Sequence, residues 1–146
     1  AGQHAELSGG VGAELLDSAR RINDLGVMDA LLLGILGNTL LCLGVWLTYS
    51  ARSTTDRILA LTPPVAAFYV LGLEHAIAVM FYLPTAAVIG AIGDASFWAA
   101  IEQPSVDVNV NGFLRVLASV TLGNILGGGV LVALVYWFVY LRPKRA

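Results

Sequence analysis

The sequence predicts an all-α integral membrane protein with three membrane-crossing elements, the middle one broken. Hydrophobic residues make up 58% of the 146 residues and charged residues only 12%, about half the charged share of a soluble domain. Such a composition cannot cover the surface of a water-soluble protein of this size. The apolar residues also gather into long stretches, separated by polar segments, that suit the thickness of a bilayer.

Residues 1–30 form a polar segment that contains an amphipathic helix. From residue 11 onward, apolar residues such as Leu15, Ala19 and Ile22 recur at helical spacing, with charged residues between them. The segment is too polar to span a bilayer and lies on the membrane surface or against protein. Because the chain begins with Ala1 and this segment lacks the features of a signal peptide, we expect a fragment or a processed product.

The first span is predicted at residues 31–50, which carry no charge. A helix of this length measures about 30 Å, the thickness of the hydrocarbon core. Trp46 and Tyr49 lie near its end, where an aromatic belt is expected. A short polar loop follows and ends at Arg57.

Residues 58–92 are predicted to form a broken span. A straight helix of this length would measure roughly 52 Å, too long for one crossing, whereas two full crossings need about 40 residues and a turn. An element interrupted inside the membrane resolves the conflict. Pro63 and Pro64 are expected to start its first half, since the first helical turn tolerates proline. Gly72, near the centre, suits the break.

The remaining segments are a polar loop at residues 93–113, a last span at 114–141 and a basic tail at 142–146. Basic residues concentrate on one side of the predicted spans: Arg52, Arg57, Arg142, Lys144 and Arg145. The positive-inside rule therefore places the C-terminus in the cytoplasm, and the N-terminal segment and the 93–113 loop outside the cell. We expect a multi-pass protein of the inner (plasma) membrane.

The sequence Gly72-Leu73-Glu74-His75 is the most informative part of the broken span. Ionisable groups near the midplane cost about 2.5–3.5 kcal/mol each and normally face protein or a water-filled path. Beside a glycine they indicate a discontinuous helix with a binding site at its break. The new helix N-terminus favours anions, and an imidazole there donates a hydrogen bond. For Glu74, pairing with neighbouring helices is the favoured role; for His75, depth and the adjacent break favour function.

Three further features concern helix packing and the lining of a path through the membrane. Asn38 and Asn124 are amides inside apolar spans and need hydrogen-bond partners, so interhelical bonding and pore lining both remain open. Gly123 and Gly127 form a small-xxx-small face that allows two helices to approach closely.

Phe68 precedes His75 by seven residues, about two helical turns. Both side chains share one face if the helix continues, and Phe68 would then narrow a path beside the histidine. The alternative is that Phe68 faces lipid or the protein core, as most membrane phenylalanines do.

Several classes of function are not expected. The basic residues form no stripe that would bind nucleic acid. Cys42 is the only cysteine and His4 lies in a polar tail, so we expect no disulfide, metal site or cofactor. No phosphate-binding loop or zinc-protease motif is present, and we do not expect an enzyme.

Three stretches, in order, resemble the formate/nitrite transporter family. Residues 34–46 resemble its Asn-x-x-Val-Cys-Leu-Ala-Val-Trp stretch, residues 72–80 its Gly-Phe-Glu-His-Ser-x-Ala-Asn-Met stretch, and residues 121–142 its last span. The resemblance implies a six-span, aquaporin-like subunit built as an inverted repeat and assembled as a homopentamer with one pore per subunit. This chain resembles the C-terminal half of that subunit.

The resemblance also implies roles for individual residues. His75 corresponds to the central pore histidine, Phe68 to a hydrophobic constriction, Asn38 and Asn124 to polar groups beside the histidine, and Glu74 to the buried carboxylate.

Some positions depart from the family pattern. Val79 stands where the family has Asn, Leu41 where it has Val, and Gly44 where it has Ala. The N-terminal repeat is not part of this sequence, so the same longer chain or a second chain would supply it.

The expected function is passage of a small monovalent anion (formate, nitrite or hydrosulfide) through the lipid bilayer, passive or coupled to protons through His75. The sequence does not choose among these anions. Two alternatives remain: a structural or interaction subunit, in which His75→Ala lowers stability and not transport, and an aquaporin-like channel for a neutral solute, whose flux is independent of pH and of His75.

Overall fold

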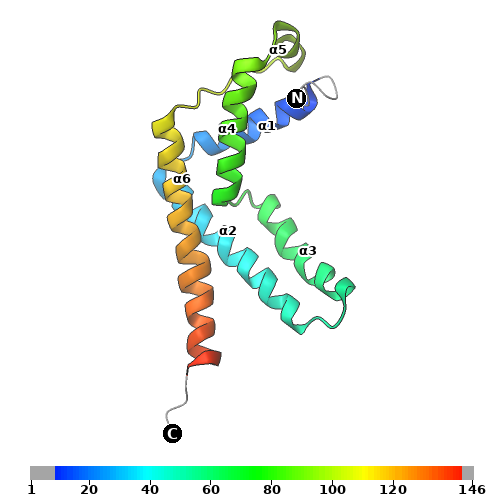
Figure 1. Ribbon diagram of the computed structural model, residues 1–146, viewed down its shortest axis with the longest axis vertical. Coiled ribbons are helices and arrows are strands. Elements are labelled where there is room, and N and C mark those ends of the chain that lie inside the picture. The colour runs from blue at the N-terminus through cyan, green and yellow to red at the C-terminus, as the bar shows by residue number, and fades with distance from the viewer. Residues whose placement is uncertain (1–8, 143–146) are drawn as a thin grey trace. The chain divides into compact units, whose positions relative to one another are not determined.

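The structure is a computed structural model that describes residues 9–142, and every regular element in that range is helical (Figure 1). The elements are, in order, α1 (Gly10–Asn23), α2 (Val27–Leu47), the short 3-10 helix η2 (Thr48–Ser50), α3 (Thr54–Val70), α4 (Ala76–Ile92), α5 (Ala95–Ile101), α6 (Val110–Asn124) and the π-helical stretches η3 (Ile125–Leu134) and η4 (Trp137–Leu141). The predicted features at His4, Lys144 and Arg145 lie outside the described residues.

The chain divides into two compact units. The first comprises Ala1–Gly26 and Ile77–Leu117, and the second comprises Val27–Ala76 and Ala118–Ala146. The first unit therefore holds α1, nearly all of α4, α5 and the first half of α6. The second holds α2, α3, the segment between α3 and α4, and the continuation of α6 into η3 and η4.

In the first unit, α1 is an amphipathic helix that ends at Asn23. Helix α2 begins at Val27, inside the polar segment predicted at residues 1–30. The buried face of α1 includes Leu16, Ala19 and Ile22, each fully buried, at the three-residue spacing of one helix face.

The predicted loop at residues 93–113 is partly helical, because it contains α5 and the first turn of α6. The Asp94 side chain caps α5 by accepting a hydrogen bond from the Phe97 backbone N–H at 2.8 Å. Aspartate is a favoured N-cap residue because it satisfies an amide that lacks a partner in the first turn. The Trp98 indole donates to the Gly93 carbonyl at 3.0 Å and closes this corner.

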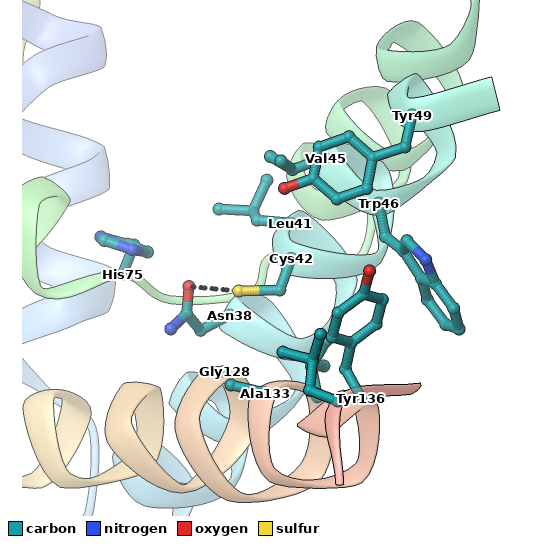
Figure 2. Close-up of a pocket in the computed structure, with 12 residues that line it drawn as sticks. Asn38, Leu41, Cys42, Val45, Trp46, Tyr49, His75, Gly128, Ala133 and Tyr136 are labelled. Atoms are coloured by element: carbon teal, nitrogen blue, oxygen red, sulfur yellow. Dashed lines mark hydrogen bonds between the residues drawn. The ribbon is translucent and has the colours of Figure 1, made fainter. Parts of the chain in front are cut away.

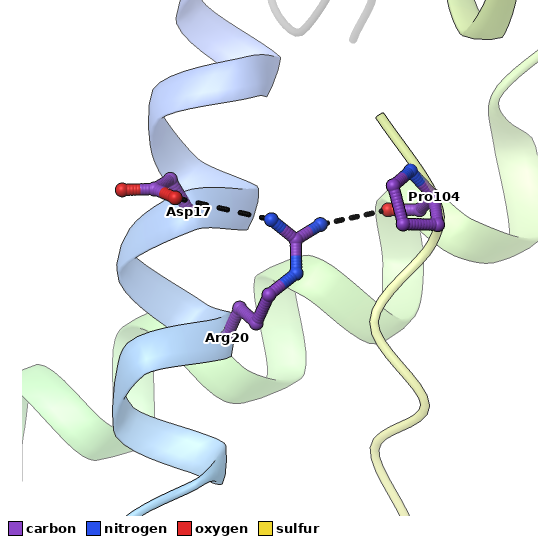
Figure 3. Close-up of polar contacts among 3 residues, drawn as sticks. All are labelled: Asp17, Arg20 and Pro104. Carbon is purple, nitrogen blue, oxygen red and sulfur yellow. Dashed lines mark hydrogen bonds and ion pairs between the residues drawn. The ribbon is translucent and has the colours of Figure 1, made fainter. Parts of the chain in front are cut away.

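Arginine side chains tie the polar segments of the first unit to α1. Figure 3 shows the Arg20 guanidinium between Asp17, at 3.8 Å, and the Pro104 carbonyl, to which it donates at 3.0 Å. Arg115 donates to the Asn23 carbonyl at 3.3 Å. The exposed ion pair adds little stability, and the hydrogen bond to the Pro104 carbonyl links the segment after α5 to α1.

In the second unit, α2 and α3 form a helical hairpin through η2 (Figure 1). A capping box starts α3: the Ser53 side chain accepts from the Asp56 N–H, and the Asp56 carboxylate accepts from the Ser53 N–H. The prediction that Pro63 and Pro64 start this helix is wrong. They lie inside α3, because the capping box of Ser53 and Asp56 already starts the helix at Thr54.

Glycines allow α2 to lie against the last helix with the two backbones nearly in contact. A Cβ atom at Gly34 would lie 2.8 Å from the Val120 carbonyl oxygen. Cβ atoms at Gly123 and Gly127 would collide with the carbonyl oxygens of Leu31 and Ile35. No larger residue fits at these positions without moving a helix.

Two helices within residues 9–142 are long and apolar enough to cross a membrane. They are Val27–Ser50, with 24 residues, and Val110–Leu141, with 32 residues. Only 22% of the apolar window of each is buried in the structure, so most of this surface needs lipid or another protein to cover it. Helices α3 and α4 have 17 residues each, about 25 Å, and fall short of the hydrocarbon core. Crossing by this pair stays a prediction.

The glycine contacts predict opposite effects for two alanine substitutions in η3. Gly127→Ala is expected to destabilise the protein by about 1–3 kcal/mol, because the new methyl group meets the backbone of α2. Gly129→Ala is the matched control, since nothing lies within 4 Å of its Cβ position, and it should be neutral or stabilise by about 0.5–1 kcal/mol. Thermal unfolding in detergent measures both, and equal effects would contradict the packing.

Candidate functional site

The break between α3 and α4 is a compact, hydrogen-bonded turn. Helix α3 ends at Val70, and Gly72 adopts a left-handed conformation with φ 61°. The Gly72 N–H donates to the Tyr69 carbonyl and the Leu73 N–H to the Phe68 carbonyl, both at 3.1 Å. This pair of bonds is the Schellman motif, in which glycine ends a helix at little steric cost.

Phe68 belongs to the end of α3 and His75 to the break, so the helix does not continue between them. The condition under which they would share one helix face is therefore not met. Phe68 and Leu73 are each only 7% exposed and hold the positions of the hydrophobic pair that accompanies this motif. The Phe68 ring lies 2.9 Å from the Cβ position of Gly37. Its role as a constriction stays a prediction.

Helix α2 packs against the break. The Glu74 N–H donates to the Leu33 carbonyl at 3.4 Å. The Glu74 carbonyl oxygen lies 2.6 Å from the Cβ position of Gly37, so only glycine admits the turn at this depth. Glu74 itself is 1% exposed.

Asn124 links the break to α6 through its side-chain amide. Its Oδ1 accepts from the Ala76 N–H at 2.9 Å, which satisfies the first amide of α4. Its Nδ2 donates to the carbonyls of Gly34 at 3.0 Å and Glu74 at 3.4 Å. The side chain is buried, and these three partners are all backbone groups.

Asn38 lies on α2 and is less deeply buried than Asn124. Its Nδ2 donates to the backbone carbonyl of Asn124 at 2.8 Å, where α6 passes into the π-helical η3. Its Oδ1 accepts a weak hydrogen bond from the Cys42 thiol at 3.8 Å (Figure 2). The spacing of four residues between Asn38 and Cys42 is a sequence signal that the two side chains meet on one helix face.

A largely apolar pocket of about 520 Å³ opens in front of Asn38 and His75 (Figure 2). Its wall is formed mainly by α2, η3 and η4. The rings of Trp46 and Tyr136 pack edge to face, with their centroids 5.7 Å apart. The other lining residues are Leu41, Cys42, Val45, Tyr49, Gly128, Val132, Ala133 and Leu141. His75 is half-buried and reaches the pocket from the break.

The structure thus divides the predicted site residues into two sets. Asn38 and His75 line the pocket, whereas Asn124, Glu74 and Phe68 lie buried in the packing around the break. Within residues 9–142, no three His, Cys, Asp or Glu side chains gather where they could hold a metal ion.

Comparison with known proteins identifies the family. The sequence pattern of the formate/nitrite transporter family matches residues 2–138. The chain belongs to the formate/nitrite transporter family. It is 38% identical over 147 residues to the formate channel FocA of Escherichia coli K12, covering 98% of this chain and 52% of FocA. It is 33% identical over 105 residues to a probable formate transporter of Methanothermobacter thermautotrophicus, covering 72% and 33% of the two chains.

A solved structure also matches. The pentameric formate channel with formate bound superposes with a TM-score of 0.84 at 41% identity, covering 96% of this chain and 56% of that one. The chain spans about half the length of the curated relatives it matches. Family membership and the two long apolar helices make it a membrane-embedded protein, and the relatives named above are channels or transporters.

The left-handed turn at Gly72 predicts a graded effect of substitution. Gly72→Ala should destabilise the protein by about 1 kcal/mol, because a Cβ atom is disfavoured at positive φ. Gly72→Asn should cost less, since asparagine tolerates this conformation. Gly90→Ala, in open space on α4, is the control. Thermal unfolding midpoints should rank Gly72→Ala lowest, and a midpoint for it equal to that of Gly90→Ala would refute the assignment.

Proposed function

We propose that this protein carries small monovalent anions (formate, nitrite or hydrosulfide) across the membrane, with His75 as the central pore group. The observation that carries the proposal is the position of His75, directly before the first residue of α4 at a helix break and on the wall of a pocket shared with Asn38. Membership of the family, and relatives named as formate channels, support an anion as the substrate.

The chemistry of the break suits an anion. The N-terminus of a helix carries partial positive charge. Helix α4 has 17 residues, long enough for this field to act on an anion near its first turn. The His75 imidazole adds a hydrogen-bond donor at the same place. These groups replace part of the water that the anion loses on entering an apolar passage.

Passage is passive or coupled to protons. An isolated charge in an apolar throat is costly, and proton transfer from His75 to the anion would produce a neutral acid that avoids most of this cost. Phe68 is proposed as the hydrophobic constriction, which excludes water and hydrated cations. Enzymatic chemistry is not part of the proposal.

The proposed pore needs more protein than this chain. We infer that the chain forms one half of an aquaporin-like inverted repeat with three membrane-crossing elements, the middle one broken at Gly72. The N-terminal repeat comes from the same longer chain or from a second chain. The pentameric state of the solved formate channel supports a homopentamer. Arg52, Arg57 and Arg142 favour a cytoplasmic C-terminus in the inner (plasma) membrane.

The test is anion uptake by proteoliposomes that contain the purified protein, measured with formate and nitrite between about pH 5 and 8, a window that brackets an unperturbed imidazole. Uptake by the unmodified protein should rise as pH falls, because a protonated imidazole attracts the anion. His75→Ala should lower uptake about 10- to 100-fold, the value of a hydrogen bond to a charged group. His75→Gln, which keeps a donor but does not titrate, should retain more uptake and lose the pH dependence.

Other outcomes would support the alternatives. Unchanged uptake by a less stable His75→Ala protein would make the histidine structural. Uptake of glycerol that is independent of pH and of His75 would indicate a neutral-solute channel. If the folded protein takes up nothing, co-reconstitution with the N-terminal repeat separates a missing half from a wrong function.

A further inference from the structure

We propose that Asn124 is a positioning residue for anion passage: its side-chain amide clamps the helix break and fixes the start of α4 beside His75, without contacting the anion. The inference rests on the proposed function and deepens it. It separates two asparagines that the family resemblance groups together as polar neighbours of the histidine.

The hydrogen bonds of Asn124 leave its amide no donor for a ligand. A side-chain amide has two N–H donors, and Asn124 directs them to the carbonyls of Gly34 and Glu74, at 3.0 and 3.4 Å. Its oxygen accepts from the Ala76 N–H at 2.9 Å. An anion that bound Asn124 would have to displace one of these carbonyls from the amide, so binding would cost an existing hydrogen bond.

Burial agrees with this assignment. Asn124 is 7% exposed and is not among the residues that line the pocket, whereas Asn38 is half-buried and lines it beside His75. The Asn38 side chain donates its hydrogen bond to the main-chain carbonyl of Asn124. Removal of the Asn124 side chain therefore leaves the Asn38 bond in place, and the two residues can be tested separately.

The clamp acts where the geometry matters most for His75. Asn124 comes from α6, Gly34 from α2, and Glu74 and Ala76 are the two neighbours of His75 in sequence. The amide thus bonds the backbone on both sides of the histidine and holds it to two helices. A shift of about 1 Å in a group that orients a reactant can cost about a hundredfold in rate.

The experiment is a rescue by proline at the first position of α4. Ala76→Pro removes the N–H that Asn124 satisfies, and proline is favoured at this helical position. With Asn124 present, the proline ring meets the amide oxygen that lies 2.9 Å from the nitrogen. In the double variant with Asn124→Ala, the proline ring has room. The first residue of α4 then has no N–H that needs an acceptor. Formate uptake, its half-saturating concentration and the thermal midpoint are measured for both single variants and the double variant.

The proposal expects a compensating pair. Asn124→Ala should lower the maximal rate of uptake about 10- to 100-fold, and adding Ala76→Pro should recover about tenfold of that loss. Thr39→Val is the matched control, because its hydroxyl bonds only the Ile35 carbonyl of its own helix at 2.7 Å, and Ala76→Pro should not rescue it. If Asn124→Ala folds poorly, the same cycle is run with Asn124→Ser.

Three results would overturn the role of Asn124 in a protein that conducts. These are a double variant no better than Asn124→Ala, an Asn124→Ala variant that changes only the half-saturating concentration, and one that loses thermal stability with unchanged uptake. An unmodified protein that folds but takes up no anion, even when it is co-reconstituted with the N-terminal repeat, overturns the proposed function itself, and so is distinguishable from a failure of the clamp.

Discussion

A helix that stops and restarts leaves backbone N–H and C=O groups without partners in either helix, and each such group that is buried and unpaired costs several kcal/mol. The second unit of this protein is organised around satisfying them. The Schellman turn at Gly72 supplies N–H donors to carbonyls at the end of α3. The Leu33 carbonyl accepts from the Glu74 N–H, and the Asn124 side-chain oxygen accepts from the first N–H of α4. Each bond comes from a different element, so the position of His75 depends on all of them.

The hydrogen bonds of the break require helices that approach closely. A side-chain amide on α6 reaches the carbonyl of Gly34 on α2 only because glycines line both faces of the crossing. Gly37 does the same for the turn itself, whose Glu74 carbonyl lies where a side chain would otherwise be. The glycines therefore act on the proposed pore indirectly, by setting the distance across which Asn124 bonds.

Polar groups around the break also differ in whether they line the pocket. Asn124 has its donors engaged by the backbone, whereas Asn38 and His75 stand at the edge of an apolar pocket. A low-polarity wall strengthens any electrostatic interaction made at that edge. The same wall makes a bare anion costly, so a proposed channel gains from few, well-placed donors next to a helix N-terminus.

The sequence by itself determined the helical class, the two long apolar helices and the place of the break, because charge and hydropathy decide what a bilayer accepts and Gly72 marks where a helix can end. The proline pair predicted the start of α3 at Pro63, whereas the capping box of Ser53 and Asp56 starts the helix at Thr54. The sequence also left Asn38 and Asn124 with the same alternatives, since spacing cannot say which partners an amide finds. Only the tertiary structure decided that Asn124 bonds the backbone on both sides of His75 while Asn38 faces the pocket, because those partners are brought together from helices far apart in the chain.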